Sequence, residues 1–200
     1  MERLTFGMKD TQEAISIRNH ILLTFEKLII ERSRSDDGNW NIVIVGSGPT
    51  GVELAGAFAE MKNYVLPRDY PHMNFHDLKI ILISSTEKPL SVMSTEAQNK
   101  SEQYLKQLGV KFLSGERVTD YDGDKVVLDS GKTIPSNNVI WAAGVTGNII
   151  NGFEPEKIIK NRYMVDRYNR IQGYHNIFAI GDIACMETPK YPHGHPQVAN

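Results

Sequence analysis

The sequence contains one cysteine, Cys185, among its 200 residues. A single cysteine cannot form an internal disulfide, and without a CxxC pair the chain has neither a zinc ribbon nor a dithiol redox centre. His193 and His195 have no third ligand nearby, so we expect no metal site. The net charge of -2 gives no basic surplus of the kind that nucleic acid or anionic lipid attracts, which excludes both as primary partners.

Long hydrophobic runs are absent as well. No stretch approaches the ~18 apolar residues that a membrane span requires, and no apolar run follows Met1 as it does in a signal peptide. The hydrophobic and charged fractions, 40% and 23%, are ordinary for a globular chain. We therefore expect a soluble, cytoplasmic protein with one large domain or two small ones.

Short aliphatic runs alternate with helical patterns between residues 41 and 114. The predicted strands and helices, in order, are strand 41–45, helix 50–64, strand 79–84, helix 95–108 and strand 110–114. This alternation indicates an α/β fold, a Rossmann-like parallel sheet with crossover helices. The proline-containing segment 64–78 is interpreted as a surface excursion.

The flanking segments carry different patterns. Residues 10–31 place apolar residues at spacings of three and four, which predicts a helix with one apolar face, followed by a polar linker at 32–38. After residue 115, short runs separated by Asp-Gly and Ser-Gly turns predict a three-stranded antiparallel meander that leads into a buried strand at 138–142. A further buried strand is predicted at 176–180.

The segment IVIVGSGPTGVELAG places a G-x-G-x-x-G pattern between the first strand and the first crossover helix. The first glycine permits the turn, the second lets the backbone approach a pyrophosphate, and the third allows close packing of helix and strand. The amides at the helix start then face the phosphates. We predict that the dinucleotide-binding residues are Gly46, Gly48, Pro49, Thr50 and Gly51.

Other motifs are weaker. There is no GK[ST] sequence for a P-loop, and the YxxxK match at Tyr121–Lys125 falls in a turn, where the two side chains would not share a helix face. The second strand ends at Ser84, which cannot accept two ribose hydroxyls as a carboxylate would, and Glu87 follows three residues later. Glu87 favours NAD(H), whereas Lys88 leaves NADP(H) open.

Taken together and in this order, GSGPTGVELAGAFAEM, DSGKTIPSNNVIWAAGV, YHNIFAIGDIAC and GHPQVAN resemble type II NADH dehydrogenases. These enzymes are single-subunit NADH:quinone oxidoreductases of the two-dinucleotide-binding-domain flavoprotein superfamily. The resemblance implies FAD and NAD(H) as cofactors, NADH and a quinone as partners, and hydride transfer from NADH to FAD. It also implies a linker helix and FAD-domain remnant at 1–35, an NAD(H)-binding domain at 36–143 and a partial FAD-binding domain at 144–200.

The resemblance also implies roles for individual residues. Glu53 would lie near the nicotinamide, although a plain stabilising effect of its carboxylate on the helix dipole is an alternative. Asp182, after Gly181, would accept hydrogen bonds from hydroxyl groups of FAD. The remaining implied cofactor contacts are Ala143 and Gly144 at the crossover between the domains, and Gln197, Val198 and Ala199 at the flavin ring.

Departures from the family pattern leave alternatives open. The chain has one nucleotide-binding glycine turn rather than two, and the family's C-terminal membrane-binding region has no counterpart, so we expect a fragment of a parent peripheral to the cytoplasmic face of the inner membrane. The fragment alone could be a non-catalytic NAD(H)-binding module. A ferredoxin-reductase-type flavoprotein is a further alternative, while sulfide:quinone and thioredoxin reductases need reactive cysteines that a chain with only Cys185 does not supply.

Overall fold

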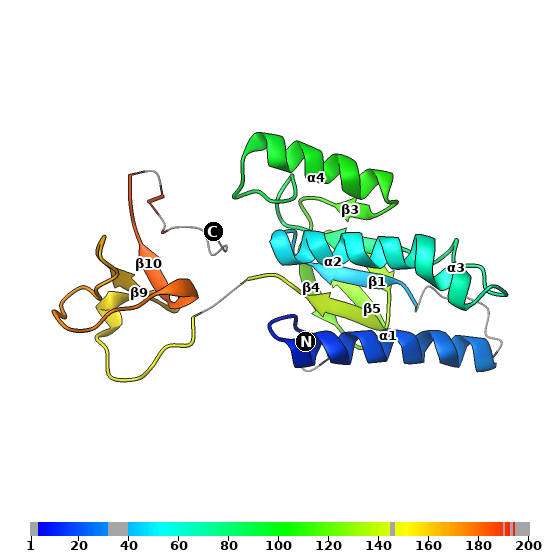
Figure 1. The fold of residues 1–200 in the computed structure, drawn as a ribbon, viewed down its shortest axis with the longest axis horizontal. Helices are drawn as coiled ribbons and strands as arrows, with labels where there is room; N and C mark the ends of the chain where they lie inside the picture. Colours follow the sequence, from blue (N-terminus) through cyan, green and yellow to red (C-terminus); the bar gives the residue numbers. More distant parts are fainter. Residues whose placement is uncertain (1–3, 32–39, 145–146, 190, 193, 195–200) are drawn as a thin grey trace. The chain divides into compact units, whose positions relative to one another are not determined.

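The computed structural model describes residues 4–31, 40–144, 147–189, 191–192 and 194. Its contacts divide the chain into two compact units, Met1–Ala143 and Gly144–Asn200. The predicted linker at 32–38 lies outside the described residues. Figure 1 shows the elements of both units.

A four-stranded parallel sheet forms the centre of the first unit. Its strand order is β3-β2-β1-β7, with all neighbours parallel. The strands are β1 (Ile42–Val45), β2 (Ile80–Ile83), β3 (Lys111–Leu113) and β7 (Asn138–Trp141). All residues of β1 and β2 are buried, as expected for a parallel sheet covered on both faces. The predicted α/β fold with a parallel sheet is confirmed.

Alternate residues of β1 face two different layers. Ile42 and Ile44 pack in a core cluster with residues of the helices, whereas Val43 and Val45 pack in a second cluster with Tyr121. The helices are α1 (Thr11–Glu31), α2 (Pro49–Glu60), the π-helical η2 (Met61–Val65), α3 (Leu66–Asp69) and α4 (Thr95–Gln107). Because side chains alternate between the two faces of a strand, β1 packs against the helices on one face and against the meander on the other.

The meander has three antiparallel strands in the order β4-β5-β6. They are β4 (Val118–Tyr121), β5 (Lys125–Leu128) and β6 (Thr133–Pro135). The β4–β5 turn is closed by Asp122, whose carboxylate accepts hydrogen bonds from the amides of Asp124 and Lys125 at 3.0 and 2.9 Å. The meander predicted from the Gly-containing turns is therefore confirmed.

The N-terminal segment is joined to β7. Phe6 donates its amide to the carbonyl of Val139 at 2.9 Å and accepts from the amide of Trp141 at 2.7 Å, so it pairs with the outer edge of this strand. Helix α1 follows, and Asp10 caps it by accepting from the Glu13 amide at 2.9 Å. His20 of α1 lies 3.0 Å from the Asn137 carbonyl, which fixes the helix beside β7.

The segment 64–78 differs from the prediction of a surface excursion. Leu66, Phe75 and Leu78 are 1%, 5% and 0% exposed and belong to the core cluster on the helical face. The Phe75 ring lies 6.1 Å from that of Trp40, and Lys62 donates to the Leu78 carbonyl at 2.6 Å. Most other residues of the segment are exposed. The prediction is therefore wrong only for these three core side chains, which stand among prolines and polar residues.

The second unit contains a small mixed sheet. Its strand order is β10-β9-β8, and its elements are η3 (Pro155–Lys157), β8 (Ile158–Ile159), β9 (Arg162–Val165), η4 (Gly181–Ile183) and β10 (Ala184–Met186). Tyr163, Val165, Ile171 and Ala179 form its core.

The buried strand predicted at 176–180 is not formed. This segment has one isolated bridge, between Phe178 and Arg170, and a hydrogen bond from the Ala179 amide to the Asn169 carbonyl at 2.9 Å. Of its apolar side chains only Ala179 is buried, while Phe178 and Ile180 are 58% and 74% exposed. The prediction failed because an apolar composition does not require burial on both faces, and in the described chain the segment pairs only with residues 169–171.

Tyr121 gives the fold a measurable pH dependence. Burial, assisted by the carboxylates of Asp124 and Asp122, raises the pKa of its phenol from 10.0 to about 12. Because the pKa is raised in the folded state, the contribution of the protonated Tyr121 phenol to the free energy of unfolding is complete below about pH 10. It is lost as the pH rises through about 12. In an alkaline absorbance titration, Tyr121→Phe should remove a phenolate transition near pH 12, and the exposed control Tyr104→Phe should leave that transition in place.

Candidate functional site

The turn after β1 requires glycine at its first position. Gly46 has φ +106°, and its amide donates to the Ile83 carbonyl at 2.8 Å, which joins the turn to the end of β2. A Cβ atom at this position would lie 2.6 Å from Ala143 Cα and 2.7 Å from Ala143 N, closer than side chains tolerate. Gly46 therefore allows the ends of three neighbouring strands to meet.

The third glycine sets the distance between helix and strand. A Cβ atom on Gly51 would lie 1.8 Å from the carbonyl oxygen of Gly46 and 3.6 Å from Cγ2 of Ile44. Gly51 is buried within the first turn of α2. The helix consequently begins directly over the carboxyl end of β1, where open α/β sheets bind ligands.

The second glycine faces open space. A Cβ atom on Gly48 would meet no atom within 4 Å in the described part of the chain, and Gly48 is the N-cap of α2. Pro49 takes the first helical position, where its missing amide costs nothing. Among the described residues, the amides of Gly48, Thr50 and Gly51 donate no backbone hydrogen bond. These donors and the positive end of the helix dipole can receive an anionic group.

A chain of hydroxyl groups joins the glycine turn to the loop after β2. Ser47 donates to Ser84 at 2.6 Å, and the Ser84 hydroxyl lies 2.9 Å from that of Thr86. Ser47 and Ser84 are each 6% exposed. The Leu90 amide adds a 2.8 Å hydrogen bond to the Ser47 carbonyl, with Leu90 at φ +53°. Ser84, predicted as a cofactor contact, is thus engaged in positioning two loops.

Glu87 and Lys88, the charged residues of that loop, differ in their contacts. Glu87 is exposed, and its Oε1 would lie 3.7 Å from a Cβ atom on Gly115. Lys88 donates to the side-chain oxygen of Asn99 on α4. The cation that left NADP(H) open in the sequence is therefore bound to an amide within the protein, whereas the Glu87 carboxylate is accessible to solvent.

The other predicted residues of the first unit are Glu53 and Ala143. Glu53 is exposed on α2, and Ala143 accepts from the indole of Trp141 at 3.1 Å. Ala143 and Gly46 are brought together, as are Ser84 and the glycine turn. Sequence analysis missed Ser47, Thr86 and Leu90, because a hydrogen-bonded hydroxyl pair and a positive φ at leucine leave no pattern in the sequence.

The remaining predicted residues fall after Ala143. Gly144 is exposed at φ +80°, Gly181 has φ +72°, and the exposed Asp182 lies in η4. Gln197, Val198 and Ala199 lie outside the described residues, as do His193 and His195. Within the described part of the chain, no group of three His, Cys, Asp or Glu side chains could hold a metal ion, and no helix is both long and apolar enough for a membrane span.

Comparison with known proteins shows the family of the chain. The family model described as pyridine nucleotide-disulphide oxidoreductase matches residues 22–200. The chain is 32% identical to a type II NADH:quinone oxidoreductase of Mycobacterium tuberculosis, over 90% of this chain and 41% of that protein. It is 31% identical to the external alternative NAD(P)H-ubiquinone oxidoreductase B1 of Solanum tuberosum, over 95% of this chain and 34% of that protein.

A solved structure shows the same fold. The NDH2 of Plasmodium falciparum, determined in complex with NADH, matches with a TM-score of 0.81 at 24% identity, over 93% of this chain and 40% of that one. The chain therefore spans less than half the length of these relatives.

The close approach at Gly51 generates a stability prediction. Gly51→Ala should lower the free energy of unfolding by about 1–3 kcal/mol or more, since its methyl group must displace the Gly46 backbone. Gly56→Ala is the matched control on the same helix: its Cβ would lie 3.9 Å from Leu108 Cδ1, and alanine favours a helix interior by about 0.5–1 kcal/mol. Denaturant unfolding measures both; equal stability of the two variants would contradict the packing role of Gly51.

Proposed function

Because the chain belongs to the pyridine nucleotide-disulphide oxidoreductase family, we propose that it supplies the NADH-binding domain and part of the FAD domain of an NADH:quinone oxidoreductase. In this proposal residues 36–143 hold NADH, and residues 1–35 and 144–200 belong to the FAD domain. The proposal is supported by the similarity to type II NADH:quinone oxidoreductases over 90% or more of the chain.

The observation that carries the proposal is the open space at Gly48. Gly46 and Gly51 are needed to pack protein against protein, but a Cβ atom on Gly48 would meet no atom of the described residues within 4 Å. A glycine at this position leaves room for the diphosphate of a dinucleotide directly above the amides of α2. The protein thus supplies fixed hydrogen-bond donors to the phosphates without a cationic side chain.

Glu87 supports NADH as the nucleotide. An exposed carboxylate in the loop after β2 can accept hydrogen bonds from both ribose hydroxyls and repels the additional phosphate of NADPH. Lys88, the nearest cation in this loop, is bound to Asn99. In the proposed complex Glu87 selects NADH, and Ser84 holds the loop in position through Ser47.

The remaining residues act toward the nicotinamide and the flavin. Glu53, exposed on α2, orients the nicotinamide. The exposed carboxylate of Asp182, after the left-handed Gly181, is suited to accept hydrogen bonds from hydroxyl groups of FAD, and Ala143, Gly144 and residues 197–199 complete the contacts. Bound FAD would supply the redox chemistry, accepting a hydride from NADH and passing two electrons to a quinone. We place the parent protein at the cytoplasmic face of the inner membrane, because quinones are dissolved in the lipid of that membrane.

Gly48→Ala tests the nucleotide site. Because φ is -69° and the added Cβ would meet no described atom within 4 Å, the variant should fold as stably as the unsubstituted chain. Its methyl group would occupy space needed by the diphosphate, so the dissociation constant for NADH should rise by roughly tenfold or more, as for an overpacked contact of about 1–3 kcal/mol. Calorimetric titration with NADH measures the effect, and Gly56→Ala should bind NADH unchanged.

The same preparation separates an enzyme from a binding module. A purified chain with the visible absorbance of bound flavin and quinone-dependent NADH oxidation supports the enzyme. A colourless chain that binds NADH supports a non-catalytic module. A chain without measurable heat on titration with NADH or NADPH would overturn the nucleotide site itself.

A further inference from the structure

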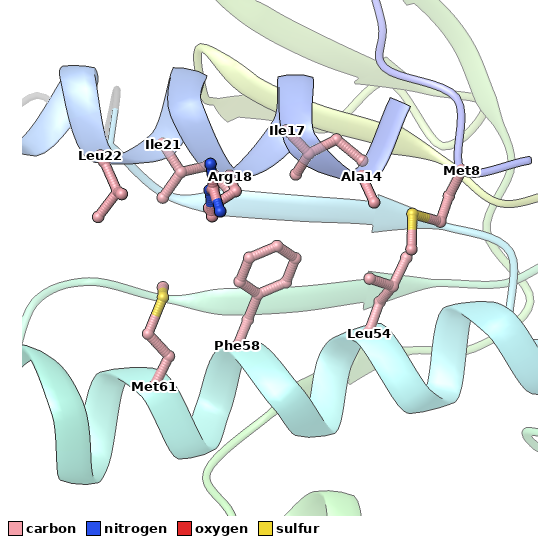
Figure 2. Close-up of a pocket in the computed structure, with 9 residues that line it drawn as sticks. All are labelled: Met8, Ala14, Ile17, Arg18, Ile21, Leu22, Leu54, Phe58 and Met61. Carbon is pink, nitrogen blue, oxygen red and sulfur yellow. The ribbon is translucent and has the colours of Figure 1, made fainter. Parts of the chain in front are cut away.

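A cavity of about 120 Å³ lies between α1 and α2. Figure 2 shows side chains from both helices directed into this space. Ile17 and Ile21 of α1 form one wall, and Leu54 and Phe58 of α2 form the other. The two isoleucines are 3% and 2% exposed, so the base of the cavity belongs to the protein core.

Size and lining select a small apolar body. Empty apolar cavities of about 150 Å³ in proteins stay dry and accept benzene, so a space of this size suits a single ring or a short alkyl chain. Met8 and Met61 also line the cavity, and their flexible thioethers adapt to different apolar shapes. Apart from Arg18, the described lining side chains are apolar and offer no strong hydrogen-bonding group to an adenine or a ribose.

Arg18 is the one charged residue of the nine that line the cavity, and Figure 2 shows it on α1 between Ile17 and Leu22. Its Nε and Nη2 atoms lie 3.3 and 3.0 Å from the side-chain oxygen of Asn19. A guanidinium has five N–H donors in a fork that matches a carboxylate, so donors remain for a second acceptor. A single exposed cation beside an apolar cavity is complementary to a ligand with one anionic group on an apolar body.

We propose that this cavity binds a small monocarboxylate, with its apolar tail or ring between α1 and α2 and its carboxylate on Arg18. The nine lining residues all belong to the first unit of the described chain. The cavity is independent of the nucleotide site, since none of the residues predicted to contact NADH lines it.

Hexanoate and 1-hexanol are suitable probes, because they share an apolar chain and differ in charge. We expect both to shift the amide resonances of α1 and α2 in NMR titrations, hexanoate with roughly millimolar affinity or better. Arg18→Gln should weaken hexanoate about tenfold and leave 1-hexanol unchanged. Arg18→Lys should recover part of the loss, and Lys27→Gln, on an exposed part of the same helix, should change neither ligand.

Ala14→Leu tests the cavity itself. Alanine lines the space, and leucine is a good helix former that would fill it, so both probes should lose binding while NADH binding is retained. Leu54→Phe serves the same purpose from α2 if the first variant does not fold. Any of three results would overturn the proposal. Hexanoate could bind equally well to Arg18→Gln and to the unsubstituted chain, binding could survive in a folded cavity-filling variant, or the unsubstituted chain could show no shift with hexanoate.

Discussion

The structure of the first unit depends on the contact between the Gly46 carbonyl and Gly51. With a side chain at either position, α2 could not begin over the end of β1, and Gly46 could not lie against Ala143 at the end of β7. The close approach orients the first turn of the helix so that its unpaired amides face the carboxyl edge of the sheet. Packing and ligand recognition are therefore set by the same backbone geometry, and the side chains around it mainly hold it in place.

The hydroxyl groups of Ser47, Ser84 and Thr86 show how that geometry is held. Burying a hydroxyl group costs free energy unless it is hydrogen-bonded. The buried hydroxyl groups of Ser47 and Ser84 bond to each other across two loops, and the half-buried Thr86 bonds to Ser84 and to the Lys88 carbonyl. The arrangement couples the glycine turn to the loop that carries Glu87. In the proposed function, the phosphate and ribose subsites are thus positioned relative to each other by hydrogen bonds within the protein.

Much of this fold could be predicted from the sequence because its signals are local. The four strands of the parallel sheet were placed to within one or two residues, since aliphatic runs of this length between glycine turns and helical patterns have few other interpretations. Phe75 and Leu78 could not be placed in the core, because their burial depends on Trp40 and the distant α1 rather than on any period. The segment 176–180 misled for the opposite reason: its composition is that of a buried strand, but its pairing partners in the described chain occupy only one side. The predicted domain boundaries and cofactor contacts remain predictions.

The pairing of β1 with both β2 and β7 has a consequence for synthesis of the chain. Ile42 is in register with Asn138 of β7, so β1 can pair with β2 on one edge long before β7, its partner on the other edge, has been translated. Contacts so distant along the chain form late and slowly. Until residue 141 leaves the ribosome, one edge of β1 and the backbone of Phe6 lack the strand that covers them, and the nascent domain passes through a stage in which chaperones can bind it.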